Sequence, residues 1–239
     1  MSSQENKHTG PLYSKQNQII NGTFKPYIQP GQQTPANLVP TLIHRFHSKE
    51  GYALYPDVIP LLKQLRNQQT SNGGRVMIGV ITNSDNRTAD ILTSMGVRVN
   101  PIHYGDKPKR GDFDPEKFDI NFTVLSYDVG CEKPDRRIFG AAEEMVVSML
   151  ERDAGSTQKP DLHGWRKVYV GDEYDKDVVG ATNAGWQAVL IDRETAGKQR
   201  DVEWLDDQQP SSLFDVLDRA KAVGFSSLSK LSEWLPSRS

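Results

Sequence analysis

Short apolar runs alternate with amphipathic stretches along most of the chain. The apolar runs are rich in β-branched side chains and end in small or polar residues, a pattern typical of buried strands. They predict strands over residues 76–81, 122–126, 168–170 and 188–191. Between and after these runs, apolar residues recur at helical spacing and predict helices over residues 58–65, 87–95, 137–150, 211–222 and 228–235. Strands that alternate with helices favour an α/β fold built on a parallel sheet.

The beginning of the chain has a different pattern. Residues 1–14 are polar and lack periodicity, so we expect a flexible tail there. Residues 13–27 and 34–47 each show an apolar face at helical spacing, and prolines separate the two stretches. Two short helices cannot bury such faces alone. We therefore expect residues 15–50 to form a helical lobe that packs on another part of the protein, and residues 51–239 to form the α/β core.

Composition narrows the classes of partner. The 239 residues carry a net charge of −2 and contain no long apolar run, so neither nucleic acid nor a membrane is an expected partner. The lone Cys131 rules out an internal disulfide framework, and the N-terminus shows no secretory signal pattern. These features predict an intracellular protein and leave cytoplasm and nucleus open.

Two acidic side chains follow the predicted strand 168–170. Gly171 permits a turn after this strand, Asp172 comes next, and Asp177 opens the following helix. In an open α/β sheet, ligands bind at the carboxyl ends of the strands, and paired carboxylates there suit a hard cation such as Mg²⁺. The alternative is structural, with Asp172 closing a turn and Asp177 capping a helix. Taken alone, this stretch does not choose between the two interpretations.

Polar groups also follow two other predicted strands. Thr82 and Asn83 come after strand 76–81, and Lys133 comes after strand 122–126. A doubly wound sheet would bring these groups to the same edge as the two aspartates. Such a set suits phosphoryl transfer, because Mg²⁺ and a lysine neutralise charge while hydroxyl and backbone N–H groups hold phosphate oxygens. Individually, Thr82 is also compatible with an ordinary strand end and Lys133 with a solvated loop.

These stretches resemble motifs of the haloacid dehalogenase-like (HAD) hydrolase superfamily, specifically its members with a helical cap. The matching segments are VITNSD, CEKPDRRIF, VGDEYDKDVVGATNAGW and, at the return from the cap, RFHSKEGYALYPDVIPLLKQLR. The resemblance implies that Thr82 and Asn83 bind phosphate, that Lys133 steadies phosphate and nucleophile, and that Asp172 and Asp177 position Mg²⁺. It implies a Rossmann-like parallel sheet with helices on both faces, a partial cap over residues 15–50, and a phosphatase for a small phosphorylated metabolite.

One family motif has no counterpart in the chain. The superfamily's first strand runs into Asp-x-Asp, whose first aspartate is the nucleophile and whose second is a general acid and base. Residues 1–14 contain neither an aspartate nor an apolar strand. The Asp-x-Asp pair outside the matching segments, Asp112 and Asp114, lies in a loop rich in Pro and Lys, and we do not expect it to be catalytic. No nucleophile is therefore assigned, and the chain is expected to be inactive or impaired.

The missing strand also has a structural consequence, because in this family it lies in the middle of the sheet. Without it, the strands that end at Thr82 and Asp172 lack a neighbour between them, at a cost of roughly 1 to 3 kcal/mol per unpaired group. We expect the strands to close up, a partner or a second copy to cover the gap, or the chain to be a truncated version of a longer protein. The alternative function is a non-catalytic binding or regulatory protein of the same fold.

Overall fold

The computed structural model divides the chain into two compact units, Met1–Ala53 and Leu54–Ser239. It describes residues 11–68, 76–112, 114, 116–154, 160–194 and 201–236. Residues 1–10 of the expected flexible tail lie outside the described residues. The two units are described separately below.

The first unit is helical, as the amphipathic pattern predicts. It contains α1 (Pro11–Phe24), the 3₁₀-helix η1 (Lys25–Tyr27) and α2 (Leu38–Arg45). Residues 11–14 of the expected tail belong to α1. Val39 and Ile43 of α2 are buried. Several large apolar side chains of this unit remain exposed, namely Ile19, Phe24, Tyr27, Phe46 and Tyr52.

The second unit contains two parallel sheets. The first pairs β1 (Gly79–Thr82) with β2 (Phe122–Leu125). The second has the order β3-β4-β6-β5. Its strands are β3 (Val168–Gly171), β4 (Gln187–Ile191), β5 (Glu203–Trp204) and β6 (Ala222–Phe225). Every recorded strand pair is parallel, so the carboxyl ends of paired strands lie at the same edge.

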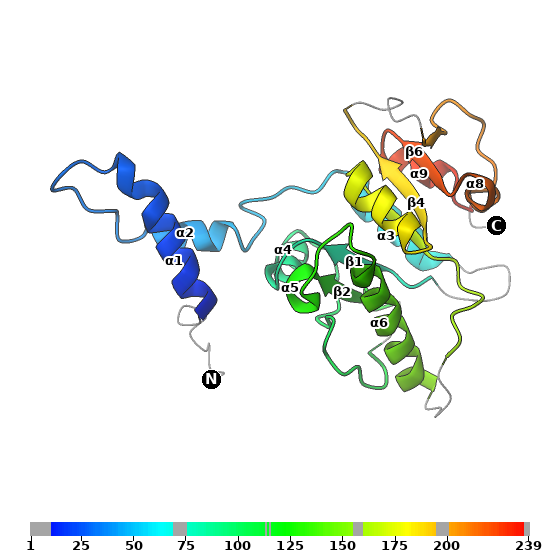
Figure 1. The fold of residues 1–239 in the computed structure, drawn as a ribbon, viewed down its shortest axis with the longest axis horizontal. Helices are drawn as coiled ribbons and strands as arrows, with labels where there is room; N and C mark the ends of the chain where they lie inside the picture. Colours follow the sequence, from blue (N-terminus) through cyan, green and yellow to red (C-terminus); the bar gives the residue numbers. More distant parts are fainter. Residues whose placement is uncertain are drawn as a thin grey trace. The chain divides into compact units, whose positions relative to one another are not determined.

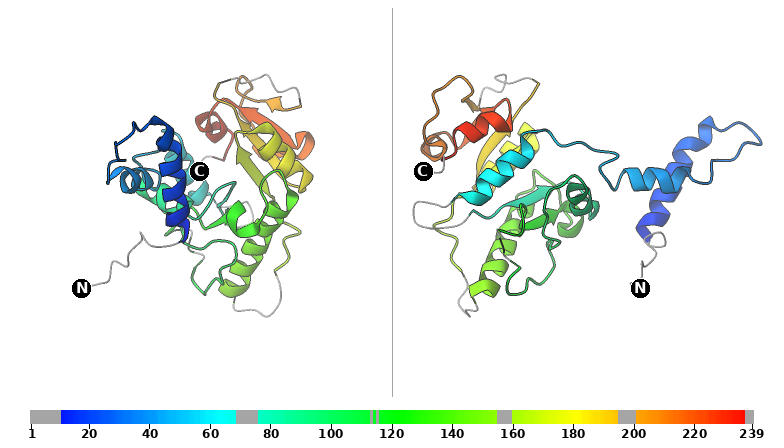
Figure 2. Two further views of the ribbon diagram at one scale, coloured as in Figure 1. Left: turned by 60° about the vertical axis from the view of Figure 1, so that its left-hand side comes forward. Right: turned by 180° about the vertical axis from the view of Figure 1, so that it is seen from behind.

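Helices cover both faces of these sheets. They are α3 (Val58–Asn67), α4 (Arg87–Ser94), α5 (Ser126–Val129), α6 (Arg136–Ala154), the π-helix η2 (Tyr174–Val179), α7 (Gly180–Asn183), α8 (Leu213–Ala220) and α9 (Leu228–Glu233). Figure 1 shows α6 alongside β1 and β2, and α8 and α9 beside β6. The view from behind in Figure 2 shows α3 next to α9.

Alternation along β4 explains why the core has two halves. Ala188 and Leu190 pack in the cluster that contains the buried residues of α6, whereas Val189 and Ile191 pack in the cluster formed with α3, α8 and α9. Successive side chains of a strand point to opposite faces, so a strand covered on both sides must be apolar throughout. The predicted fold class, a parallel α/β architecture with helices on both faces, is confirmed.

A gap separates the two sheets. Within the described part of the chain no strand lies between β1 and β3, so each has one edge without a strand partner. A side chain reaches across instead, because the Tyr169 hydroxyl on β3 donates to the backbone carbonyl of Ile81 on β1 at 2.9 Å. The gap lies where the family resemblance places the absent first strand.

Two strands escaped the sequence pattern. β5 lies between the predicted strand 188–191 and the predicted helix 211–222, where the pattern predicts no element, and β6 begins at Ala222, the last residue of that predicted helix. Lys221 has a φ of 56°, a conformation that ends the helix and turns the chain into the sheet. No helix among the described residues has the length and apolar character needed to cross a bilayer.

Candidate active site

Two of the predicted site residues meet in an ion pair. The Lys133 ammonium lies 2.6 Å from Oδ1 of Asp177, and the two side chains are only 12% and 3% exposed. Lys133 lies between α5 and α6, after β2, and Asp177 lies in η2, after β3. The pair therefore joins the carboxyl ends of strands from the two separate sheets.

Asp177 folds back over the end of β3. Its Oδ2 accepts hydrogen bonds from the backbone N–H groups of Asp172 and Glu173, each at 2.9 Å. A Cβ atom at Gly171 would lie 2.2 Å from the same oxygen, so only glycine leaves room for the carboxylate. The structural alternative, in which Asp177 caps a helix, does not hold, because Asp177 lies within η2 and its carboxylate instead holds the turn after β3 while contacting Lys133.

Asn83 holds the backbone of Lys133. Its Oδ1 accepts from the Lys133 backbone N–H at 2.7 Å, and its Nδ2 donates to the Lys133 backbone carbonyl at 3.1 Å. Both halves of the amide are therefore used to fix the lysine loop against the end of β1. Phosphate binding by Asn83 stays a prediction, and the contacts in this structure are those of a positioning residue.

Tyr169 belongs to the site, although the sequence pattern marks it only as a strand residue. Its hydroxyl accepts from the Lys133 ammonium at 2.8 Å and donates to the Ile81 carbonyl. Its ring packs edge-on against Phe139 of α6, with ring centroids 5.3 Å apart. Burial, together with the charge of Asp177, raises the pKa of the Tyr169 hydroxyl, so the group stays protonated. Strand alternation places it on the α6 face, but no sequence signal identifies its partners.

Thr82 and Asp172 lie at the ends of β1 and β3. Asp172 is exposed and Thr82 is half-buried. Neither side chain forms a hydrogen bond or an ion pair with another described residue. Both residues therefore lie at the sheet edge where the family resemblance predicts a ligand site. The polar atoms of their side chains are available to bind a ligand there.

The carboxylates supply only part of a Mg²⁺ site. Asp177 already receives Lys133 and two backbone N–H groups, which leaves the Asp172 carboxylate as the accessible oxygen ligand. Within the described ranges no group of three or more His, Cys, Asp or Glu side chains could hold a metal ion. Mg²⁺ requires six oxygen ligands in octahedral geometry, several of them commonly water. The residues present therefore do not form a complete site.

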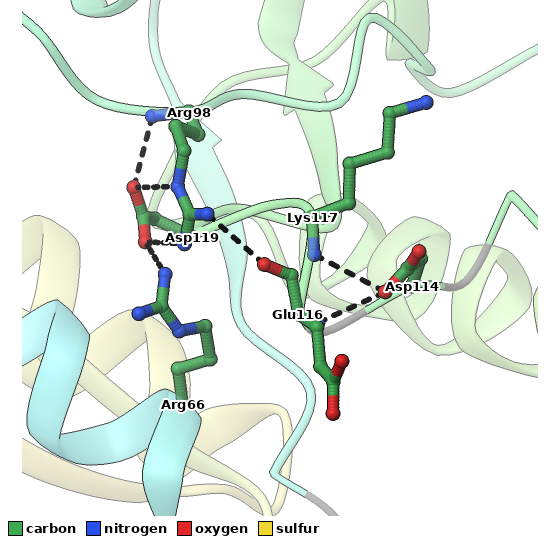
Figure 3. A network of polar contacts seen from close by, with 6 residues as sticks. All are labelled: Arg66, Arg98, Asp114, Glu116, Lys117 and Asp119. Carbon is green, nitrogen blue, oxygen red and sulfur yellow. Dashed lines mark hydrogen bonds and ion pairs between the residues drawn. The ribbon is translucent and has the colours of Figure 1, made fainter.

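The Asp-x-Asp pair outside the motifs has structural contacts. Oδ1 of Asp114 accepts from the backbone N–H groups of Glu116 and Lys117 at 3.0 and 3.1 Å, as Figure 3 shows. Oδ2 of Asp112 accepts from the Lys109 backbone N–H, and the Asp112 carbonyl accepts from Asn100. The two carboxylates thus close turns.

The same loop is fixed to α3 by a buried carboxylate. Oδ1 of Asp119, a residue that is 7% exposed, accepts from Arg66 at 2.6 Å and from Arg98 at 2.7 Å (Figure 3). Its Oδ2 accepts from the backbone N–H of Arg98 at 3.0 Å. This network stabilises the segment that runs along the outer edge of β2.

Comparisons with known proteins point to one group. A family model described as "HAD-hyrolase-like" matches residues 130–220. The chain is 30% identical over 161 residues to an uncharacterized hydrolase of Schizosaccharomyces pombe, a match that covers 67% of this chain and 57% of that protein. It is 29% identical over 198 residues to a glyceraldehyde 3-phosphate phosphatase of Methanopyrus kandleri, covering 78% of this chain and 67% of that protein.

One solved structure is also similar to this chain. A HAD phosphatase from Thermococcus onnurineus is 21% identical with a TM-score of 0.46, and the match covers 89% of this chain and 68% of that one. The chain spans little more than half the length of the Schizosaccharomyces pombe hydrolase, since the match covers 57% of that protein.

Proposed function

Because the chain belongs to the haloacid dehalogenase-like hydrolase superfamily, we propose that its site binds the phosphate group of a small phosphorylated metabolite, as a phosphatase-type enzyme does. The observation that carries this proposal is the Lys133 ammonium, held at the carboxyl ends of β1 and β3 by Asp177 and Tyr169. An ammonium has three donors. With two directed to these residues, the third is available for a phosphate oxygen.

Thr82 completes the phosphate-binding part of this proposal. Its hydroxyl lies at the end of β1, next to the Asn83 amide that fixes the Lys133 backbone. A hydroxyl and an ammonium from neighbouring strand ends can donate to different oxygens of one phosphate group. Lys133 would neutralise charge, and Thr82 would orient the group.

We propose Mg²⁺ as the cofactor of the complete site, with Asp172 as a ligand and Asp177 as the group that holds the Asp172 backbone in place. The support is the exposed Asp172 carboxylate beside the Lys133–Asp177 pair. When bound, Mg²⁺ would neutralise charge on the phosphate. Since the described residues offer a partial site, we expect this chain to bind the ion weakly.

The chain alone is proposed to lack turnover. No described residue occupies the place of the nucleophilic aspartate, and the carboxylates of Asp112 and Asp114 are engaged in turns. These contacts also favour the second candidate, a non-catalytic protein that retains the fold and binds phosphate without hydrolysing it. Intracellular location, in cytoplasm or nucleus, remains a prediction from composition.

The gap between β1 and β3 leads to a proposal about partners. Each strand has one edge without a strand partner in the described residues, and open edges of this kind pair readily with another strand. Val170 of β3 is 40% exposed, which is high for a valine in a strand. We propose that a strand from a partner or from a second copy of the chain covers the gap.

Calorimetric titration with inorganic phosphate tests the binding proposal. Lys133→Ala should weaken phosphate binding about tenfold or more, because a hydrogen bond to a charged group is lost. Lys167→Ala is the matched control, since Lys167 also pairs with a carboxylate, Glu143, at 2.7 Å, and should leave binding unchanged. Equal affinities of the wild-type protein and Lys133→Ala would overturn the proposal.

A turnover assay tests whether this chain hydrolyses a phosphate ester at all. With para-nitrophenyl phosphate and Mg²⁺, we expect no hydrolysis by this chain. Hydrolysis that Asp172→Ala abolishes and Asp112→Ala preserves would contradict the proposed deficiency. Phosphate binding without hydrolysis is the outcome expected of a binding protein and of an enzyme that lacks its nucleophile.

A further inference from the structure

We propose that Tyr169 is a positioning residue that aims the Lys133 ammonium at the phosphate site, an inference that rests on the function proposed for that site. Tyr169 lies on β3, Lys133 on the loop before α6, and the Ile81 carbonyl on β1. The tyrosine hydroxyl contacts both, accepting from the ammonium at 2.8 Å and donating to the carbonyl at 2.9 Å.

The direction of these hydrogen bonds carries the argument. A phenol has one proton to donate, and here the proton is directed to the Ile81 carbonyl. The lone pairs of the hydroxyl are thereby oriented toward the ammonium. The Ile81 carbonyl, on a strand with no partner on one side, thus fixes which way Tyr169 faces Lys133.

Two acceptors define the position of the ammonium better than one. Oδ1 of Asp177 lies 2.6 Å from the Lys133 nitrogen, and the Tyr169 oxygen lies 2.8 Å from it. Asp177 alone would leave the ammonium able to rotate about a single contact. With Tyr169 added, two of the three N–H bonds have fixed directions, so the direction of the third is also fixed.

The tyrosine is itself held in place. Its ring packs edge-on against Phe139 with an interplanar angle of 79°, and Phe139 is fully buried. The Lys133 nitrogen also lies 5.1 Å from the centroid of the Tyr169 ring. A rigid ring is what an indirect positioning role requires, because a mobile hydroxyl would transmit no geometry.

Tyr169→Phe tests this inference, since it removes the hydroxyl and keeps the ring. Wild-type protein and variant are given a short pulse of acetic anhydride at fixed pH, and acetylation of each lysine is measured by mass spectrometry. Loss of a hydrogen bond to a charged group shifts an equilibrium by about tenfold. We therefore expect Lys133 to be acetylated about tenfold faster in Tyr169→Phe, and inorganic phosphate to bind about tenfold more weakly.

Two controls make the result specific. Tyr104→Phe removes another phenol hydroxyl, which donates to Glu144 at 3.0 Å on α6, and should change neither measurement. Lys167, paired with Glu143, is the internal reference amine and should react equally in all variants. Acetylation of Lys133 at the wild-type rate in a folded Tyr169→Phe protein would overturn the inference.

The acetylation measurement does not depend on whether the proposed function is correct. If inorganic phosphate does not bind to the wild-type protein, the proposed function fails, while the acetylation rates still decide whether Tyr169 holds Lys133. A variant that fails to fold is detected by faster labelling of Lys167. In that case the wild-type tyrosine is observed directly by NMR with ¹³C-labelled tyrosine. Lys133→Met should then shift the Cζ resonance of Tyr169 and leave that of Tyr104 in place, and an unmoved Tyr169 resonance would contradict the inference.

Discussion

At the residue scale, the site depends on a glycine, Gly171, at the end of β3. Gly171 leaves the space that the Asp177 carboxylate occupies, and that carboxylate in turn holds the backbone of Asp172 and the ammonium of Lys133. A buried carboxylate is tolerated only when its oxygens are hydrogen-bonded or paired. The space left by Gly171 is therefore required for the ion pair between Asp177 and Lys133.

Gly171→Ala should displace the Asp177 carboxylate, because the new methyl group would overlap it. We expect a loss of about 1 to 3 kcal/mol in the free energy of unfolding and weaker binding of inorganic phosphate. Denaturant unfolding and calorimetric titration measure these effects. Gly140→Ala is the control, since apart from the neighbouring backbone of α6 no heavy atom lies within 4 Å of a Cβ at that position. The explanation fails if both variants are as stable as the wild-type protein.

At the element scale, one carboxylate joins the start of α3 to the C-terminal part of the fold. Asp57 accepts from Arg193 at 2.9 and 3.0 Å, and from the backbone N–H groups of Leu228 and Ser229 at the start of α9. Arg193 also lies over the ring of Tyr55, 3.9 Å from its centroid. Asp57 therefore caps a helix that is distant in sequence and neutralises the half-buried guanidinium of Arg193.

Stability in acid should depend on Asp57. Burial acts to raise the pKa of this carboxyl, but the hydrogen bonds from Arg193 and Ser229 outweigh it and lower the pKa below its ordinary value of 3.8. A lowered pKa in the folded state adds stability above about pH 4. That contribution is lost as the pH falls through the folded-state pKa.

Asp57→Asn tests this contribution. The variant should lose about 3 kcal/mol at neutral pH and show a weaker dependence of unfolding free energy on pH below about 4. Denaturant unfolding over a series of pH values measures both. Asp218→Asn, which removes an exposed partner of Arg166, should have a smaller effect. An undiminished acid dependence in Asp57→Asn would show that other carboxyls are responsible.

At the scale of the whole molecule, the division of the sheet dominates. β1 and β2 form one sheet, β3 to β6 form the other, and side chains from Lys133 and Tyr169 connect them. Such contacts are fewer than a shared strand would provide. The open edges of β1 and β3 are the places where we expect another strand to pair.

The chain should therefore associate as its concentration rises, and light scattering coupled to size exclusion measures this. Val170→Lys places a charge on β3, and a lysine at an open strand discourages pairing. The variant should stay monomeric with little change in stability, because Val170 is 40% exposed. Tyr127→Lys, a similar change at a side chain that is 69% exposed, should associate like the wild-type protein. A wild-type chain that stays monomeric at every concentration would contradict the proposal.

Sequence pattern alone determined the order of the first four strands and the main helices between them, and with it the placement of Thr82 and Asp172 at strand ends and of Lys133 in the loop before α6. This was possible because periodicity is local and parallel strands share one direction. It overlooked the two-residue strand β5, and it overlooked β6 because the helical pattern continues beyond the boundary that the backbone of Lys221 sets.

Only the tertiary structure decided which groups touch. The hydroxyl of Tyr169 meets the Ile81 carbonyl across 88 positions of sequence, and the Asn83 amide binds the backbone of Lys133 across 50. Such pairs depend on how far apart the strands lie and how each side chain packs, which the local pattern does not encode. The gap between β1 and β3 shows this most clearly. The sequence motifs predict where the gap lies, but only the packing shows that the Tyr169 hydroxyl reaches across it to the Ile81 carbonyl.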